Sequence, residues 1–140
     1  MSTILPFRAI VFDLDGTLVD TLPDIHEALN RSLSEAGLSE IGAAACRSMI
    51  GGGAHNLIEQ AFSLIGESSD DPRIDPVFAR FIDLYEAEPA VRSRPFPGAV
   101  AALEALREQG IALGICSNKP HTLTEMVLKD LKLTSFFGDA

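Results

Sequence analysis

The sequence predicts an α/β fold in which a parallel β-sheet forms the core and a bundle of helices is inserted after the first strand. Two short, continuous apolar runs, residues 8–12 and 111–116, are typical of strands buried on both faces. A polar loop and then an apolar pattern with helical spacing follow each run. Because a strand that returns through a crossover helix pairs in parallel with its predecessor, we expect a parallel sheet.

The insert, residues 20–94, is predicted to be almost entirely helical. Its first helix begins after Thr21, whose hydroxyl can cap it, and ends at Gly37. Three further helices are expected over residues 43–50, 54–65 and 76–87. No strand is expected within the insert.

The chain turns at residues 94–98 and forms a helix that Gly110 ends, before the second strand. The helix after that strand carries Thr122 and Glu125 at the spacing of a capping box. We expect Cys116 to be a buried residue of the second strand. With the distant Cys46, it is expected to remain a separate, reduced thiol.

Length and charge exclude several classes of protein. The 140 residues are enough for one ordinary globular domain, and the 11 basic and 20 acidic side chains give a net charge of −9, which argues against nucleic acid as a partner. No apolar run approaches the roughly 18 residues that a membrane span needs, and the first residues lack the pattern of a signal peptide. We expect a cytoplasmic protein with no membrane partner, and the oligomeric state stays open.

Acidic and hydroxyl side chains follow the two predicted strands. Asp13 and Asp15 come directly after the first strand, and Ser117 follows the second. In an open parallel sheet the reactive crevice lies beyond the carboxyl ends of the strands. Two carboxylates so close would repel each other unless a cation lies between them or one holds a proton. Magnesium, which prefers oxygen ligands, is the expected cation; one carboxylate could then attack phosphorus while the other donates a proton.

These segments resemble a known family. Residues 13–21, Asp-Leu-Asp-Gly-Thr-Leu-Val-Asp-Thr, and residues 117–120, Ser-Asn-Lys-Pro, are similar to the first and second motifs of the haloacid dehalogenase (HAD) superfamily of phosphohydrolases. Residues 51–54 and 117–120 are most similar to those of bacterial phosphoglycolate phosphatases. The resemblance implies a Rossmann-like HAD core, apparently incomplete, made of residues 1–19 and 95–140, and a helical cap domain of residues 20–94.

The resemblance also implies roles for individual residues. Asp13 would be the nucleophile that forms an aspartyl-phosphate, and Asp15 would be the general acid and then the general base. Magnesium would be bound by the side chain of Asp13 and the backbone carbonyl of Asp15. We expect four residues to bind the phosphate group: Thr17, Ser117, Asn118 and Lys119.

The cap could supply substrate specificity through a short segment. Arg47 could pair with a carboxylate of the substrate. The glycine run that follows, Gly51, Gly52 and Gly53, could let the backbone approach the substrate closely.

Two later motifs of the family, a lysine and a Gly-Asp pair with a further acid, are not recognisable. Gly138-Asp139 arrives two strand units too early for the second of these, and Lys119 could partly replace the missing lysine. We therefore expect an N-terminal piece of a longer protein, weakly active or inactive alone. The expected parent is a magnesium-dependent phosphatase of a small phosphorylated metabolite, with 2-phosphoglycolate as the first candidate. Alternatives are a phosphomutase similar to β-phosphoglucomutase and a non-catalytic binding or assembly module.

Overall fold

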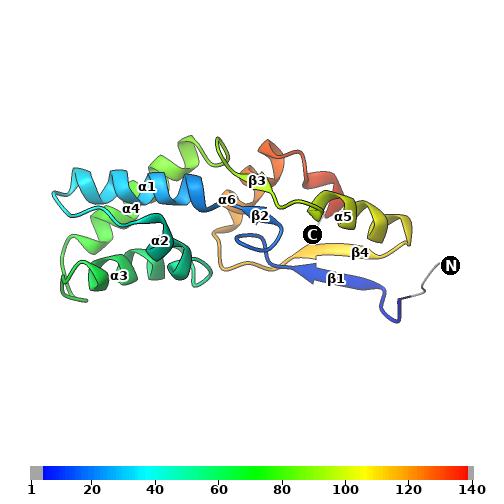
Figure 1. The fold of residues 1–140 in the computed structure, drawn as a ribbon, viewed down its shortest axis with the longest axis horizontal. Helices are drawn as coiled ribbons and strands as arrows, with labels where there is room; N and C mark the ends of the chain where they lie inside the picture. Colours follow the sequence, from blue (N-terminus) through cyan, green and yellow to red (C-terminus); the bar gives the residue numbers. More distant parts are fainter. Residues whose placement is uncertain (1–4, 139–140) are drawn as a thin grey trace.

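The β-sheet at one end of the molecule confirms the predicted parallel pairing. The computed structural model describes residues 5–138. Strand β1 (Ala9–Phe12) pairs in parallel with β4 (Ala112–Ile115), and Phe12 lies beside Ile115 in the register. The carboxyl ends of both strands point towards the helices of the insert, so the two polar loops that follow them emerge at one edge (Figure 1).

The expectation that both strands are buried on both faces is wrong. Side chains alternate between the two faces of a strand, and Val11 on one face is 63% exposed while Leu113 on the other is 6% exposed. Helix α5 (Ala99–Glu108) packs against β4, on the side of the sheet where α6 (His121–Asp130) also lies (Figure 1). The exposed face has no covering element within residues 5–138.

Four helices form the other end of the molecule (Figure 1). The ends of these helices lie within two residues of the predicted ends. The helices are α1 (Leu22–Glu35), α2 (Ala43–Met49), α3 (Ala54–Leu64) and α4 (Ile74–Ala87). Helix α1 packs against α2 and α4, and α3 packs against α2 and α4. The buried residues Val77, Phe81 and Tyr85 recur every four positions on α4, the spacing that places side chains on one face of a helix.

Both predicted side-chain caps are wrong. The hydroxyl of Thr21 is buried and has no hydrogen-bond partner among the described residues, so it does not cap α1. Helix α6 (His121–Asp130) begins after Pro120 without a side-chain cap. Glu125 instead lies 3.0 Å from the ring of His121, one turn away on the same helix.

Two short strands, absent from the prediction, join the helical part to the sheet part. Strand β2 (Val19–Asp20) pairs antiparallel with β3 (Arg94–Pro95). Two-residue strands carry no periodic pattern, which is why the sequence did not indicate them. Their pairing brings the two ends of the helical insert together.

The last elements complete the sheet end. Cys116 follows β4 and is exposed, contrary to the expectation that it is buried. A short 3-10 helix, η1 (Thr134–Phe136), follows α6. Within residues 5–138, no helix is both long and apolar enough to cross a membrane.

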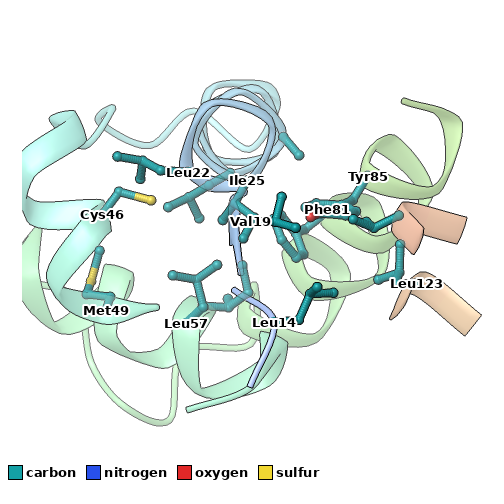
Figure 2. Close-up of a cluster of buried hydrophobic side chains, with 14 of the residues drawn as sticks. Leu14, Val19, Leu22, Ile25, Cys46, Met49, Leu57, Phe81, Tyr85 and Leu123 are labelled. Atoms are coloured by element: carbon teal, nitrogen blue, oxygen red, sulfur yellow. The ribbon is translucent and has the colours of Figure 1, made fainter. Parts of the chain in front are cut away.

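A cluster of buried apolar side chains extends from the helical part to the loop after β1 (Figure 2). Leu14 of that loop, Tyr85 of α4 and Leu123 of α6 are each 2% exposed or less. Three parts of the chain distant in sequence therefore share one core, and Leu14 anchors the loop after β1 in it.

Candidate active site

The loop after β1 is folded back on itself around a buried leucine. The side chain of Leu14 is fully buried, and its carbonyl accepts hydrogen bonds from three backbone N–H groups, those of residues 17–19. Gly16 turns the chain at a φ of 77°, a conformation that favours glycine. This folding brings Asp13 and Asp15, on either side of Leu14, to the same cleft.

The loop after β4 meets this loop because the two strands are parallel neighbours. The hydroxyl oxygen of Ser117 accepts a hydrogen bond of 3.1 Å from the backbone N–H of Lys119. The ammonium of Lys119 donates to Oδ1 of Asp15 at 3.1 Å. The second loop thus places a hydroxyl and a cation beside the two carboxylates of the first.

Burial affects the pKa of Lys119. The side chains of Lys119 and Asp15 are only 5% and 10% exposed. Burial lowers the pKa of Lys119, while the charge and hydrogen bond of Asp15 act in the opposite direction. The hydroxyl of Tyr85 accepts a second hydrogen bond from the ammonium at 2.7 Å, and burial raises the pKa of that hydroxyl, so it stays neutral.

The cleft has a polar end and an apolar wall. Its empty volume, with the open space at the mouth included, is about 460 Å³. The polar end is made of Asp13, Asp15, Ser117, Asn118 and Lys119. An apolar wall of the cleft is made of large side chains from α1–α4 and from the segment between α2 and α3: Ile25, Met49, Ile50, Leu57 and Phe81.

The structure brings most of the predicted site residues to this cleft. In addition to the polar end, Gly51 and Gly53 line it. Gly52 and two exposed residues, Thr17 and Arg47, are not among the residues that line it. Asp139 lies outside the described residues. Proximity does not test catalytic or binding roles, so all the assigned roles stay predictions.

Sequence reasoning missed Tyr85. It is the only tyrosine in the chain, and it occupies an apolar position on the buried face of α4. A tyrosine at such a position needs a partner for its hydroxyl. That need was a signal that a polar group lies against this helix, although the sequence could not show that the group is Lys119.

The oxygen atoms in the cleft suit a magnesium ion. Magnesium prefers oxygen ligands and often keeps several waters, and two carboxylates, those of Asp13 and Asp15, line the same cleft. Across residues 5–138, no group of three or more His, Cys, Asp and Glu side chains is arranged to hold a metal. The fit to magnesium therefore rests on two aspartates and on ligands from water or substrate.

Comparisons with known proteins give consistent matches. The sequence model of the haloacid dehalogenase-like hydrolases matches residues 10–139. A phosphoglycolate phosphatase of Agrobacterium fabrum is 41% identical over 128 residues, which cover 91% of this chain and 55% of that protein. A phosphoglycolate phosphatase of Caulobacter vibrioides is 41% identical over 139 residues, which cover 98% of this chain and 59% of that protein. The chain thus spans little more than half the length of these relatives.

Solved structures match the fold over nearly the whole chain. The crystal structure of a predicted phosphoglycolate phosphatase from Haemophilus somnus superposes with a TM-score of 0.85 at 26% identity, covering 97% of this chain and 62% of that one. A haloacid dehalogenase-like hydrolase of Streptococcus pneumoniae gives a TM-score of 0.80 at 29% identity, covering 94% and 59%.

Proposed function

The chain belongs to the haloacid dehalogenase-like hydrolases, and on that premise we propose that it forms the active-site cleft of a phosphatase that hydrolyses a small phosphorylated metabolite. The observation that carries this proposal is the convergence of Asp13, Asp15, Ser117 and Lys119 at one end of a small cleft. 2-Phosphoglycolate is the first candidate substrate. The relatives named phosphoglycolate phosphatase, about 40% identical, support that choice.

In this proposal the two aspartates have different roles. The carboxylate of Asp13 attacks phosphorus, so that an aspartyl-phosphate bond forms and the ester P–O bond breaks. Asp15 donates a proton to the leaving oxygen and then removes a proton from the water that hydrolyses the aspartyl-phosphate. The hydroxyl of Ser117 and the ammonium of Lys119 hold the phosphoryl oxygens, on which negative charge is concentrated.

A magnesium ion would be held by the side chain of Asp13 and the backbone carbonyl of Asp15. When bound, it supplies positive charge that offsets the charges of the phosphate and the carboxylates. We also propose that residues 20–94 act as a cap domain over a core of residues 1–19 and 95–140. The apolar wall of the cleft, which the helices supply, supports that division because such a wall excludes water from the reacting group.

We further propose that residues 1–140 alone turn over phosphoesters slowly. Phosphoryl transfer depends on positioned cations, and the part of the cleft formed by residues 5–138 holds one lysine, which is already paired with Asp15. Loss of a single electrostatic element typically costs about 10²- to 10³-fold in rate. We expect single-turnover phosphate release at least about 10²-fold slower than that of a full-length relative.

The test is phosphate release from a panel of phosphoesters that includes 2-phosphoglycolate, with and without magnesium. The chain is assayed in single turnover beside the Agrobacterium fabrum relative. We expect slow, magnesium-dependent release that the Asp13→Asn variant loses. Metal-independent release that persists in that variant would contradict the proposal. Transfer of phosphate to a second hydroxyl would indicate a mutase, and phosphate binding without any turnover would indicate a binding module.

A further inference from the structure

The ammonium of Lys119, in the loop after β4, contacts two other segments of the chain. It lies 3.1 Å from Oδ1 of Asp15, in the loop after β1. It lies 2.7 Å from the hydroxyl oxygen of Tyr85, in helix α4, and 4.2 Å from the centroid of the Tyr85 ring. Helix α4 belongs to the helical part of the molecule, whereas Asp15 and Lys119 belong to the loops at the strand ends.

Tyr85 is a rigid partner for this cation. Its side chain is 1% exposed, and its ring lies 5.7 Å, centroid to centroid, from that of Phe81 on the same helix. Figure 2 shows Tyr85 and Phe81 within the apolar cluster, near Leu123 of α6. A tyrosine has few rotatable bonds, so packing of its ring fixes the position of its hydroxyl oxygen.

The two partners of Lys119 act differently on its charge. When Asp15 is ionised, its carboxylate offsets the positive charge of the ammonium. The hydroxyl of Tyr85 accepts a hydrogen bond and carries no charge, and it does so in surroundings from which water is largely excluded. Tyr85 can therefore fix the position of the cation without itself offsetting the positive charge.

We propose that Tyr85 is a positioning residue that holds the ammonium of Lys119 at the phosphate end of the cleft, so that this end is assembled only when α4 packs against the loop after β4. The inference rests on the proposed function in one respect, because it takes the ligand to be a phosphate group. A long lysine side chain released from Tyr85 gains rotamer freedom and can turn towards solvent.

Chemical labelling of lysines tests the positioning directly. The chain has three lysines, and Lys129 and Lys132 are exposed, so they serve as internal controls. Reductive methylation followed by peptide mass spectrometry should modify Lys119 at least about tenfold more slowly than Lys129 in the unaltered chain. In Tyr85→Phe, which removes only the hydroxyl, we expect the rate at Lys119 to rise at least about fivefold. Equal rates at all three lysines in the unaltered chain, or no change in Tyr85→Phe, would overturn the proposal.

Binding of inorganic phosphate, measured by calorimetry, tests the consequence for the cleft. We expect Tyr85→Phe to weaken binding about tenfold, in line with a misplaced charge-assisted contact. Phe62→Leu is the control for general loss of packing, because Phe62 is fully buried on α3 and does not line the cleft. It should leave both phosphate affinity and Lys119 labelling unchanged. Equal weakening in both variants would overturn the positioning role.

The two experiments also separate this inference from the proposed function. Labelling of Lys119 does not depend on catalysis, so release of Lys119 in Tyr85→Phe supports the positioning contact even in a chain that hydrolyses no phosphoester. Absence of phosphate release in the panel assay would instead contradict the proposed function. Phosphatase activity with unchanged Lys119 labelling in Tyr85→Phe would contradict only the role of Tyr85.

Discussion

The side-chain amide of Asn118 donates a 2.8 Å hydrogen bond to the backbone carbonyl of Gly51, which lies 67 positions earlier in the chain. This bond joins the loop after β4 to the loop between α2 and α3, at one side of the cleft. Gly53 lies close to the same loop, since a Cβ atom at that position would be 3.4 Å from the carbonyl oxygen of Asn118. The glycine segment thus packs against the polar end of the cleft.

Substitution of Gly53 by alanine should destabilise the protein. Its φ of 92° and ψ of 162° lie in a region that L-residues rarely adopt, at a cost of about 1–3 kcal/mol. The added methyl group would lie in van der Waals contact with the backbone carbonyl of Asn118. We expect the free energy of unfolding of Gly53→Ala, from urea titration, to fall by about 1–3 kcal/mol.

Gly42→Ala is the matched control. Gly42 precedes α2 with an ordinary φ of −67°, and a Cβ there would have no atom within 4 Å. We expect its free energy of unfolding to change by less than about 1 kcal/mol. Equal losses in the two variants would show that neither the positive φ of Gly53 nor its approach to Asn118 constrains that position.

Local sequence patterns predicted the main helices and strands. The features that the sequence did not predict depend on tertiary contacts. Short continuous apolar runs were enough to find β1 and β4, and apolar positions at helical spacing were enough to find the helices. The hydrogen-bonding capacity of Thr21 suggested a cap, but burial of its hydroxyl without a partner depends on neighbours that only the folded chain brings together. Exposure of Val11 likewise depends on which face the helices cover.

The same distinction applies to the cleft. Asp13, Asp15 and Ser117 could be predicted together because strand ends at one edge of a parallel sheet meet. The contact of Lys119 with Tyr85 could not, because it depends on how α4 is oriented relative to the loop after β4. A sequence shows that Tyr85 needs a partner, and only the packing of the helices identifies it.

Asp24 is expected to stabilise the connection between the helical part and the sheet part. Its buried carboxylate accepts hydrogen bonds from the backbone N–H groups of Arg92 and Ser93 and from the Ser93 hydroxyl. Asp24→Ala leaves these donors without their acceptor, and Ser93 is fully buried. We expect a loss of about 3 kcal/mol in the free energy of unfolding, measured in urea.

Two variants check that interpretation of Asp24. Asp24→Asn keeps one oxygen acceptor and should lose less than Asp24→Ala. Glu27→Ala removes an exposed carboxylate from the same helix and should change stability by no more than about 0.5 kcal/mol. A loss in Asp24→Ala as small as in Glu27→Ala would contradict the role of this carboxylate.

The pair of Asp71 and Arg73 should make stability depend on pH in the acidic range. The carboxylate of Asp71 accepts hydrogen bonds from the backbone N–H and the guanidinium of Arg73, which lower the pKa of Asp71 to about 2. Because this pKa lies below the unfolded value of about 3.9, the unfolded state binds more protons between the two values. The stabilisation is present above about pH 4 and is lost as the pH falls towards 2.

Asp71→Asn should therefore lower the thermal midpoint at pH 7, and its difference from the unaltered chain should shrink as the pH falls from about 4. Asp70→Asn removes the same charge from the adjacent, exposed position and should show a smaller difference at pH 7. A difference for Asp71→Asn that stays constant from pH 7 to pH 3, measured by circular dichroism melts, would rule out this linkage.

The two cysteines should react with an alkylating reagent at very different rates. Cys116 is exposed at the end of β4, whereas Cys46 is fully buried on α2. Burial raises the pKa of the Cys46 thiol to about 11, so at pH 8 only about one molecule in a thousand carries the reactive thiolate there. We expect iodoacetamide at pH 8 to add one group, at Cys116, and a second only in about 6 M guanidinium chloride.

Cys116→Ser supplies the control, since it should remain unmodified when folded and gain one adduct when unfolded. Rapid labelling of folded Cys116→Ser would mean that Cys46 is accessible, which would contradict the packing of α2 against α1 and α3.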